Sequence, residues 1–329
     1  MERIKDIEKK FKLVSLFAGI GGIDLGFEFA GFNCIWANDF DKDACKTYRA
    51  NVGDQIVEGD IRLVKDQIPD HDILVGGFPC QPFSTLGKLQ GFNDQQNRGT
   101  LFFEIMDIVQ KHDTKVIILE NVKNLVTHDN GNTFKRIQEE MDKAGYFFNF
   151  KVLNSQDYGI PQRRNRVFMV CFNKKYFKDV AFEYPEPEPL TITTQDLLDK
   201  DVEEKYFLTE KISHTILGKG TKGYIVNPTI DLPISKTLTA TMHKMHRASQ
   251  DNYVTDQLNY EKNVTDKVKR INIRKLTPNE CRQLQGFPSE WTQVVCDGSA
   301  YKQFGNAVTV DVAYKVACKV MNHIEKNLK

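Results

Sequence analysis

The sequence predicts an α/β fold built around a parallel sheet, and three observations carry this prediction. Short apolar runs typical of buried strands alternate with amphipathic segments typical of helices. The first run, residues 13–17, leads into a glycine-rich turn at residues 19–22 and a helix over residues 23–30, which is how nucleotide-binding α/β folds begin. Polar and acidic side chains directly follow several strands, at the edge where open α/β sheets bind ligands.

The composition narrows the class of protein further. A chain of 329 residues with 40% hydrophobic residues can form one large domain or two moderate ones. The net charge of +1 creates no overall field that would select a partner. Seven scattered cysteines without a C-x-x-C pair argue against disulfides or a zinc site. No signal peptide and no apolar run near the ~20 residues that cross a membrane are visible, so we expect a cytoplasmic protein without a metal.

The first two strands end in candidate ligand-binding residues. The turn at residues 19–22 reads G-x-G-G, which fits a nucleotide site or a plain tight turn. Asp39 ends the second strand, where an acidic residue commonly binds ribose hydroxyls, although it could instead cap the next helix. Asp60 follows a short third strand and could contact the adenine end of a nucleoside or merely cap a turn.

A cysteine between two prolines follows the fourth strand. Residues 72–75 run into two glycines and then into Pro79-Cys80-Gln81-Pro82. Prolines stiffen the backbone, and a cysteine held at a strand end suits a nucleophile, although free cysteine is often simply buried. Residues 84–98 are too long and polar for a tight connection and indicate a loop that closes over a substrate.

Charged side chains accompany the next strands. Glu120 directly follows the strand at residues 115–119 and could donate a proton or act as a structural acid. Arg164 and Arg166 precede the strand at residues 167–171, and their alternation places them on one side. They could bind a phosphate or carboxylate, or form a solvated basic turn.

The charge distribution changes sharply after a proline-rich stretch at residues 183–189, which we interpret as a domain boundary. Residues 186–210 contain eight acidic residues against two lysines. Residues 211–275 contain 12 Lys/Arg against five Asp/Glu, a net charge of +7. This basic segment indicates a phosphate-binding face, or alternatively a solvated charged surface.

The order of these motifs resembles that of the bacterial cytosine-5 DNA methyltransferases, of the small, single-specificity type found in type II restriction–modification systems. The matching segments are residues 17–22, 77–84, 120–122, 162–166, 274–288 and 303–308. The resemblance covers the chain except residues ~185 to 270. It implies an S-adenosylmethionine-dependent methyltransferase with a Rossmann-like sheet and a smaller, mainly β target-recognition domain. The implied domains are residues 1–184 (catalytic), 185–275 (target recognition) and 276–329 (a return to the catalytic domain).

The resemblance also implies the site residues. The catalytic residues are Cys80, Glu120, Arg164 and Arg166. The S-adenosylmethionine site comprises Phe17, Ala18, Gly19, Gly21, Gly22, Asp39, Phe40, Asp60, Ile61, Phe78, Leu101, Asn306 and Val308. The residues facing DNA are Gln81, Ser84, Lys88, Arg98, Thr239, His243, Lys244 and Arg247. Asp39 departs from the family pattern, in which Glu is more frequent, so its hydrogen bond to the ribose could shift or pass through water.

The implied activity is methyl transfer to C5 of a cytosine flipped out of duplex DNA, leaving S-adenosylhomocysteine. Cys80 would attack C6, Glu120 would protonate or hydrogen-bond N3, and the arginines would hold O2 or a flanking phosphate. We expect a monomeric bacterial enzyme that acts on nucleoid DNA and protects the site of a cognate restriction endonuclease.

Three other functions compete with this one. A tRNA cytosine-5 methyltransferase shares the framework, but its usual Cys-Phe-Thr element is absent, and Cys171-Phe172 is followed by Asn173. A nucleotide-dependent oxidoreductase would not explain Cys80, Glu120 and the arginines together. A non-catalytic DNA-binding module is disfavoured because all four chemical positions are intact.

Overall fold

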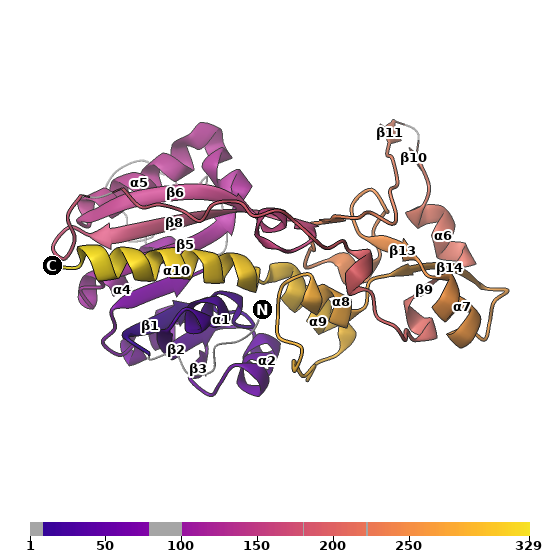
Figure 1. Ribbon diagram of the computed structural model, residues 1–329, viewed down its shortest axis with the longest axis horizontal. Helices are drawn as coiled ribbons and strands as arrows, with labels where there is room; N and C mark the ends of the chain where they lie inside the picture. Colours follow the sequence, from indigo (N-terminus) through magenta and orange to yellow (C-terminus); the bar gives the residue numbers. More distant parts are fainter. Residues whose placement is uncertain (1–8, 79–100, 180, 222) are drawn as a thin grey trace. The chain divides into compact units, whose positions relative to one another are not determined.

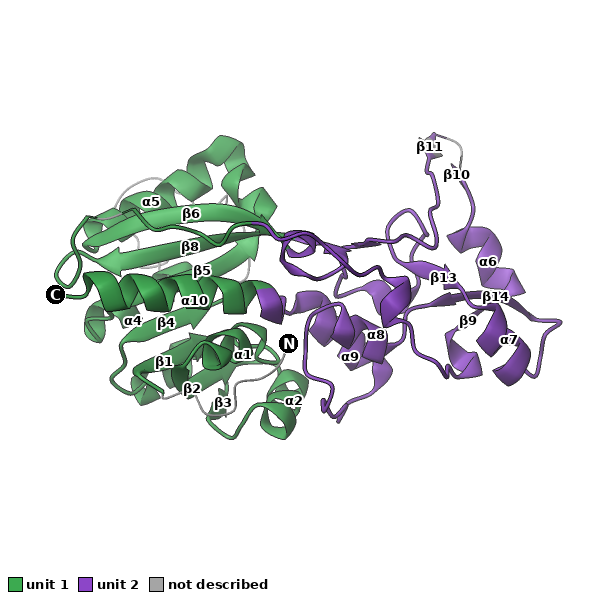
Figure 2. Ribbon diagram, viewed as in Figure 1, with its two compact units in different colours: residues 1–154, 165–186, 312–329 green, residues 155–164, 187–311 purple. Residues whose placement is uncertain are grey.

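The structure is a computed structural model that describes residues 9–78, 101–179, 181–221 and 223–329. The chain forms two compact units (Figure 2). Unit 1 comprises residues 1–154, 165–186 and 312–329, and unit 2 comprises residues 155–164 and 187–311. Unit 1 is therefore discontinuous in sequence. The division differs from the expected one, because residues 276–311 belong to unit 2 and only residues 312–329 return to unit 1.

Unit 1 contains a seven-stranded sheet in the order β3-β2-β1-β4-β5-β8-β6 (Figure 1). Its strands are β1 (Phe11–Leu16), β2 (Phe32–Asp39), β3 (Ile56–Glu58), β4 (Ile73–Gly76), β5 (Val116–Val122), β6 (Tyr146–Asn154) and β8 (Asn165–Asn173). The first five strands are parallel. Strand β8 is antiparallel to both β5 and β6, so its beginning lies at the edge where β5 ends.

Helices cover both faces of this sheet. They are α1 (Gly22–Phe29), α2 (Lys42–Asn51), α3 (Ile61–Val64), α4 (Leu101–Lys111), α5 (Asn132–Lys143) and α10 (Val310–Asn327). Apolar side chains of α3, α4 and α5 share one core with alternate residues of the central strands. On the other face, Asp24 of α1 bonds Ser15 of β1, and His323 of α10 stacks on Phe172 of β8. Coverage of both faces explains why the strands are continuous apolar runs.

Unit 2 combines short strands with helices. Its strands are β7 (Gln162–Arg163), β9 (Phe207–Thr209), β10 (Gly220–Thr221), β11 (Tyr224–Ile225), β12 (Ser235–Lys236), β13 (Tyr253–Thr255) and β14 (Arg270–Lys275). Its helices are α6 (Glu210–Ile216), α7 (Gln257–Asn263), α8 (Pro278–Gln283) and α9 (Asp297–Asn306). The strands form a three-stranded sheet, β13-β14-β9, and two pairs, β10-β11 and β12-β7. With sheets this small, side chains must hold much of the irregular backbone.

A buried ion-pair cluster marks the centre of unit 2. Arg274 of β14 is fully buried and contacts Asp256 at 2.6 Å and Glu280 at 2.8 Å. Glu280 also closes a capping box with Thr277 at the start of α8. The cluster thus joins the three-stranded sheet to α7 and α8 through charges that would be costly to bury singly.

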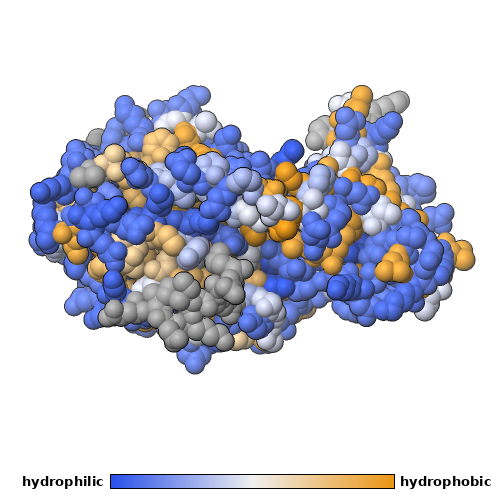
Figure 3. All heavy atoms as spheres, in the orientation of Figure 1, coloured by the Kyte–Doolittle hydropathy of each residue, from blue (hydrophilic) through white to orange (hydrophobic). Residues whose placement is uncertain are grey.

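The surface is largely hydrophilic on the face drawn in Figure 3. Isolated apolar side chains, including Ile225 and Val268, are exposed in unit 2, as is usual for folded proteins. Within the described part of the chain, no helix is long and apolar enough to cross a membrane.

Candidate active site

The candidate site lies at one edge of the unit 1 sheet. Strands β1 to β5 end there, and the antiparallel β8 begins there. Predicted site residues at or directly beyond these strand ends are Phe17, Ala18, Gly19, Gly21, Gly22, Asp39, Phe40, Asp60, Ile61, Phe78, Glu120 and Arg166. Parallel topology therefore gathers side chains from distant parts of the sequence.

The glycine turn after β1 has an unusual backbone that leaves space above it. Phe17, Gly19 and Gly21 all have positive φ, at 55°, 57° and 86°. A Cβ on Gly21 would lie 2.9 Å from a Val52 methyl carbon, so this position requires glycine. A Cβ on Gly19 would meet nothing within 4 Å. The turn thus offers an open backbone surface to a ligand.

Asp39 fixes that turn. Its carboxylate accepts one hydrogen bond from the backbone N–H of Gly19 and one from that of Asp41, both 2.8 Å long. Burial raises the pKa of Asp39, and these backbone hydrogen bonds oppose that effect. Each carboxylate oxygen has a second lone pair, so a ribose hydroxyl could still bind. The neighbouring Phe40 side chain is 73% exposed.

The connection after β2 is held by two polar side chains. Asn38, which the sequence analysis did not single out, donates from its amide to the carbonyls of Val57 and Gly59, both at 2.9 Å. Asp60 caps α3 by accepting from the Arg62 N–H, and its hydrogen bonds with the Arg62 guanidinium lower the pKa of Asp60 to about 2. Asp60 therefore has the capping role that its sequence position allowed, and Ile61 beside it is buried.

The backbone leading to Cys80 is anchored beside Glu120. A Cβ on Gly77 would lie 3.4 Å from Oε2 of Glu120. Asn121 donates from its side-chain amide to the carbonyl of Phe78 at 2.8 Å. The Phe78 ring is buried against Phe102. These contacts fix the chain as far as Phe78. Cys80, Gln81, Ser84, Lys88, Arg98 and the predicted closing loop at residues 84–98 lie outside the described residues.

Glu120 is oriented by Arg166. Nε of Arg166 lies 2.9 Å from Oε1 of Glu120, and side-chain exposures are only 17% and 9%. Arg166 begins β8 opposite Val122 in the ladder, so the backbone pairing itself brings these groups together. Arg166 also donates to the carbonyl of Asn165. Glu120 thus has one oxygen toward Arg166 and the other toward Gly77.

Arg164 has a different environment from the one expected from its alternation with Arg166. Its side chain is buried in unit 2, where it donates to the carbonyls of Leu238, Gly305 and Ala307 at 2.6–2.9 Å. The physical reason is a break in the strand: β7 ends at Arg163 and β8 begins at Asn165, so the period of two does not continue through Arg164.

The remaining predicted residues have varied environments. In unit 1, Leu101 begins α4 and is partly buried. In unit 2, Asn306 is exposed at the end of α9, whereas Val308 is buried. Lys244 is exposed, and Thr239, His243 and Arg247 are half-buried. One nitrogen of Arg247 donates to the carbonyls of Thr215 and Gly218.

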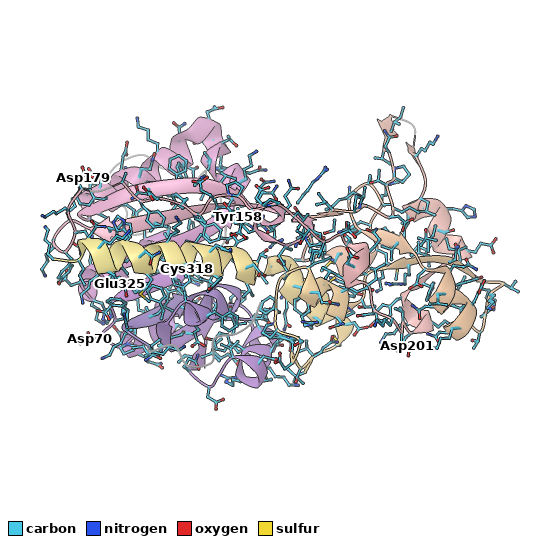
Figure 4. All side chains as sticks on the ribbon, viewed as in Figure 1. Asp70, Tyr158, Asp179, Asp201, Cys318 and Glu325 are labelled. Carbon is cyan, nitrogen blue, oxygen red and sulfur yellow. The ribbon has the colours of Figure 1, made fainter. Side chains whose placement is uncertain are left out.

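The positive charge of residues 211–275 is partly used inside unit 2. Arg274 is buried in the ion-pair cluster, and Lys236 donates to three backbone carbonyls. Lys262 pairs with Asp201, which is labelled in Figure 4. A net charge of +7 therefore overstates the charge that this segment can offer to phosphates.

Comparisons with known proteins agree with this geometry. A family model described as C-5 cytosine-specific DNA methylase matches residues 11–322. The type II methyltransferase M.HhaI of Haemophilus parahaemolyticus is 37% identical, covering 97% of this chain and 97% of its own length. M.Bsp6I of Bacillus sp. (strain RFL6) is 39% identical, covering 93% and 97%.

Solved structures confirm the predicted fold class. The Dnmt2 methyltransferase of S. pombe superposes with a TM-score of 0.71 at 19% identity, covering 96% of this chain and 98% of that one. A putative DNA modification methyltransferase encoded in an E. coli prophage gives 0.63 at 19% identity, covering 96% and 100%. Fold, strand-end geometry and sequence similarity agree over nearly the whole chain, which therefore belongs to the C-5 cytosine-specific DNA methylase family.

Proposed function

We propose that this DNA cytosine-5 methyltransferase uses Cys80 as nucleophile and Glu120 as the group that acts on cytosine N3. The observation that carries the proposal is the position of Glu120. Its carboxylate is held by Arg166 and lies beside Gly77, three residues before Cys80 in the chain. A buried, oriented acid next to the approach to a proline-flanked cysteine suits covalent catalysis with proton transfer.

The residues at the sheet edge fit S-adenosylmethionine, the methyl donor that the family implies. The space above Gly19 accepts a ligand close to the backbone, and Asp39 retains lone pairs for ribose hydroxyls. When bound, this donor supplies an electrophilic methyl group on its sulfonium sulfur. We propose the other contacts from the sequence motifs: Phe17, Ala18, Gly21, Gly22, Phe40, Asp60, Ile61, Phe78, Leu101, Asn306 and Val308.

The chemistry of the protein side chains follows from these positions. The Cys80 thiolate bonds to C6 of the cytosine, which makes C5 nucleophilic enough to take up the methyl group. Glu120 protonates or hydrogen-bonds N3, so negative charge does not accumulate on the ring. Arg166 keeps Glu120 in place and contributes a donor to O2. A base then removes the C5 proton, and the thiolate leaves C6.

The substrate must be a flipped base, because C6 is out of reach inside a duplex. We propose that residues 84–98 close behind it, and that Gln81, Ser84, Lys88, Arg98, Thr239, His243, Lys244 and Arg247 face the DNA. The relatives are named type II methyltransferases, which supports a modification role in a restriction–modification system. We expect a cytoplasmic monomer that shares its site with a cognate endonuclease and does not bind it.

One assay tests the proposal against its rivals. Duplex DNA and tRNA are offered in parallel with tritiated S-adenosylmethionine, using wild-type protein and the Cys80→Ser variant. We expect label in DNA only, and none with the variant, whose DNA binding should remain. Label in tRNA, or a variant with near wild-type turnover, would overturn the assignment. Bisulfite sequencing of the methylated DNA then gives the recognition site.

A second experiment traps the covalent step. A duplex with 5-fluorocytosine at the target position should give a stable protein–DNA adduct, because fluorine cannot leave as a proton does. The adduct should appear on a denaturing gel with wild-type protein and S-adenosylmethionine. Its absence with active protein would exclude attack by Cys80 on C6.

A further inference from the structure

A buried guanidinium joins two separate backbone segments of unit 2 to its own segment. Arg164 is 1% exposed. Its Nη1 donates to Leu238 at 2.9 Å, and its Nη2 donates to Gly305 at 2.9 Å and Ala307 at 2.6 Å. Carbonyls buried without a donor are costly, so Arg164 stabilises this one arrangement of the segments. A planar guanidinium presents its N–H donors in a fixed fork, so the three carbonyls around Arg164 are matched to a geometry that a lysine ammonium does not reproduce.

Two of the joined segments are also in direct contact. A Cβ built on Gly305 would lie 2.2–2.4 Å from the backbone of Thr239 and Ala240. Helix α9 therefore meets residues 239–240 backbone to backbone, and no other residue fits at 305 without moving one of them. The contact lies one residue from Asn306.

A buried glutamine reinforces the same junction. Gln162 is fully buried, accepts from the Leu238 N–H at 2.9 Å and donates to the Leu284 carbonyl at 2.7 Å. Leu238 therefore has both its N–H and its carbonyl held by side chains from residues 162–164. With both backbone groups of Leu238 held by buried side chains, the segment that follows begins from a fixed point.

The far end of the DNA-facing segment is held separately. Nζ of Lys236 donates to the carbonyls of Thr229, Ala248 and Asp251. Residues 239–247, which carry the predicted DNA contacts, thus run between two basic side chains, the buried Arg164 and the half-buried Lys236. Of these two, Arg164 is the one that also binds the segment at residues 305–307.

We propose that Arg164 is a positioning residue that couples duplex binding to cofactor binding by fixing residues 239–247 to residues 305–307. The inference rests on the proposed function, which assigns Asn306 to the cofactor and residues 239–247 to DNA. Contact between the cofactor and Asn306 favours one position of residues 305–307. Because Arg164 hydrogen-bonds these residues and Leu238 together, that position also determines where Thr239 lies. If the cofactor raises the affinity for the duplex by a given factor, thermodynamic linkage requires that the duplex raise the affinity for the cofactor by the same factor.

The test measures that factor. The dissociation constant of S-adenosylhomocysteine is determined by calorimetry with and without a saturating duplex that carries the site found by sequencing. Wild-type protein should bind several-fold more tightly with the duplex present. Arg164→Lys and Gly305→Ala, which disturb the junction from its two sides, should bring the ratio close to one and weaken duplex binding about tenfold or more.

Lys236→Met is the matched control. It frees the far end of residues 239–247 but leaves the junction intact, so it should weaken duplex binding while the coupling ratio stays at the wild-type value. If Arg164→Lys keeps the ratio and loses only the single-turnover rate, Arg164 contacts the reacting base and the inference is wrong. An equal loss of coupling in Lys236→Met would also overturn it.

Hydrogen exchange on wild-type protein tests the inference without any variant that could fail to fold. Adding S-adenosylhomocysteine alone should slow amide exchange in residues 239–247, and unchanged exchange there would contradict the coupling. Failure of the proposed function would look different, because wild-type protein would then neither methylate nor bind duplex DNA.

Discussion

The two units position their key side chains by different physical means. In unit 1, strand ends bring Asp39, Glu120 and Arg166 to one edge, and the hydrogen-bonded ladder sets their spacing. In unit 2, short strands leave long irregular segments, and the basic side chains of Arg164, which is buried, and Lys236, which is half-buried, hold the backbone carbonyls. A substitution at the unit 1 edge should therefore affect chemistry or ligand binding more than folding. Inside unit 2, a substitution should affect folding more than chemistry or ligand binding.

The largest expected effect concerns Glu120. Glu120→Gln keeps the size of the side chain but removes the proton donor and the charge facing Arg166. We expect kcat to fall by about 10²- to 10⁴-fold, with the unfolding free energy nearly unchanged. Single-turnover methylation and urea unfolding measure the two quantities. A variant that unfolds easily but methylates normally would reverse the comparison between the units.

Arg274 provides the opposite case in unit 2. Arg274→Met leaves the buried carboxylates of Asp256 and Glu280 without their cation, which should lower the unfolding free energy by about 3–5 kcal/mol. Lys262→Met is the control, because its pair with Asp201 is largely exposed and should contribute at most about 1 kcal/mol. Similar losses in both variants, measured by urea unfolding, would contradict the role assigned to burial.

A histidine far from the site gives unit 1 a pH-dependent stability. Burial lowers the pKa of His71 to about 4, and its ring nitrogens contact the Pro69 carbonyl and the Thr114 hydroxyl. His112, Asp70 and Asp72 are the neighbouring titratable groups. As the pH falls, the unfolded state binds a proton on His71 at a higher pH than the folded state does. The contribution of neutral His71 to stability is therefore complete above about pH 6.5 and is lost as the pH falls toward 4. The loss amounts to up to about 3 kcal/mol.

His71→Gln isolates this effect from the other titrating groups. The difference in unfolding free energy between wild type and variant should shrink as the pH falls from 7 to 4.5. A constant difference across that range would show that His71 does not titrate between the folded and unfolded states.

The smallest expected effect concerns Asp39. Asp39→Asn replaces one acceptor oxygen by an NH₂ group that faces a backbone N–H, of Gly19 or of Asp41. We expect S-adenosylhomocysteine to bind about tenfold more weakly, a loss of about 1.4 kcal/mol, while duplex affinity changes less. Calorimetry measures the first quantity and a filter-binding assay the second.

Unit 1 could be predicted from the sequence better than unit 2, and the reason is physical. Buried parallel strands leave a strong apolar signal, and residues that end them must share an edge, which is how Asp39 and Glu120 could be located. The environment of Arg164 could not be predicted, because its partners are the backbone carbonyls of residues 238, 305 and 307. Every residue has such a carbonyl, so the sequence does not show which ones a side chain will contact. The compact units divide the chain after residue 311, whereas the sequence led us to expect a division after residue 275, because α8 and α9 belong to unit 2.

The net charge of residues 211–275 does not show which of their basic side chains are available to bind phosphates. The basic segment was identified by composition, but composition does not distinguish a lysine that faces solvent from Lys236, whose ammonium is enclosed by carbonyls. Asn38 and Asn121 were also missed as positioning residues, because an asparagine at a strand end is common in turns of every kind.

The antiparallel pairing of β5 and β8 has a consequence for how this protein can change in evolution. Glu120 and Arg166 are joined through the ladder, with Val122 opposite Arg166. The chain between them forms α5, which packs into the core, and β6, which pairs with β8. Insertions or deletions in the turns that join these elements can therefore change the surface without altering the spacing of the two charged groups, whereas changes within α5 or β6 would disturb the core or the sheet. The chemistry is thereby insulated from length variation in those connecting turns.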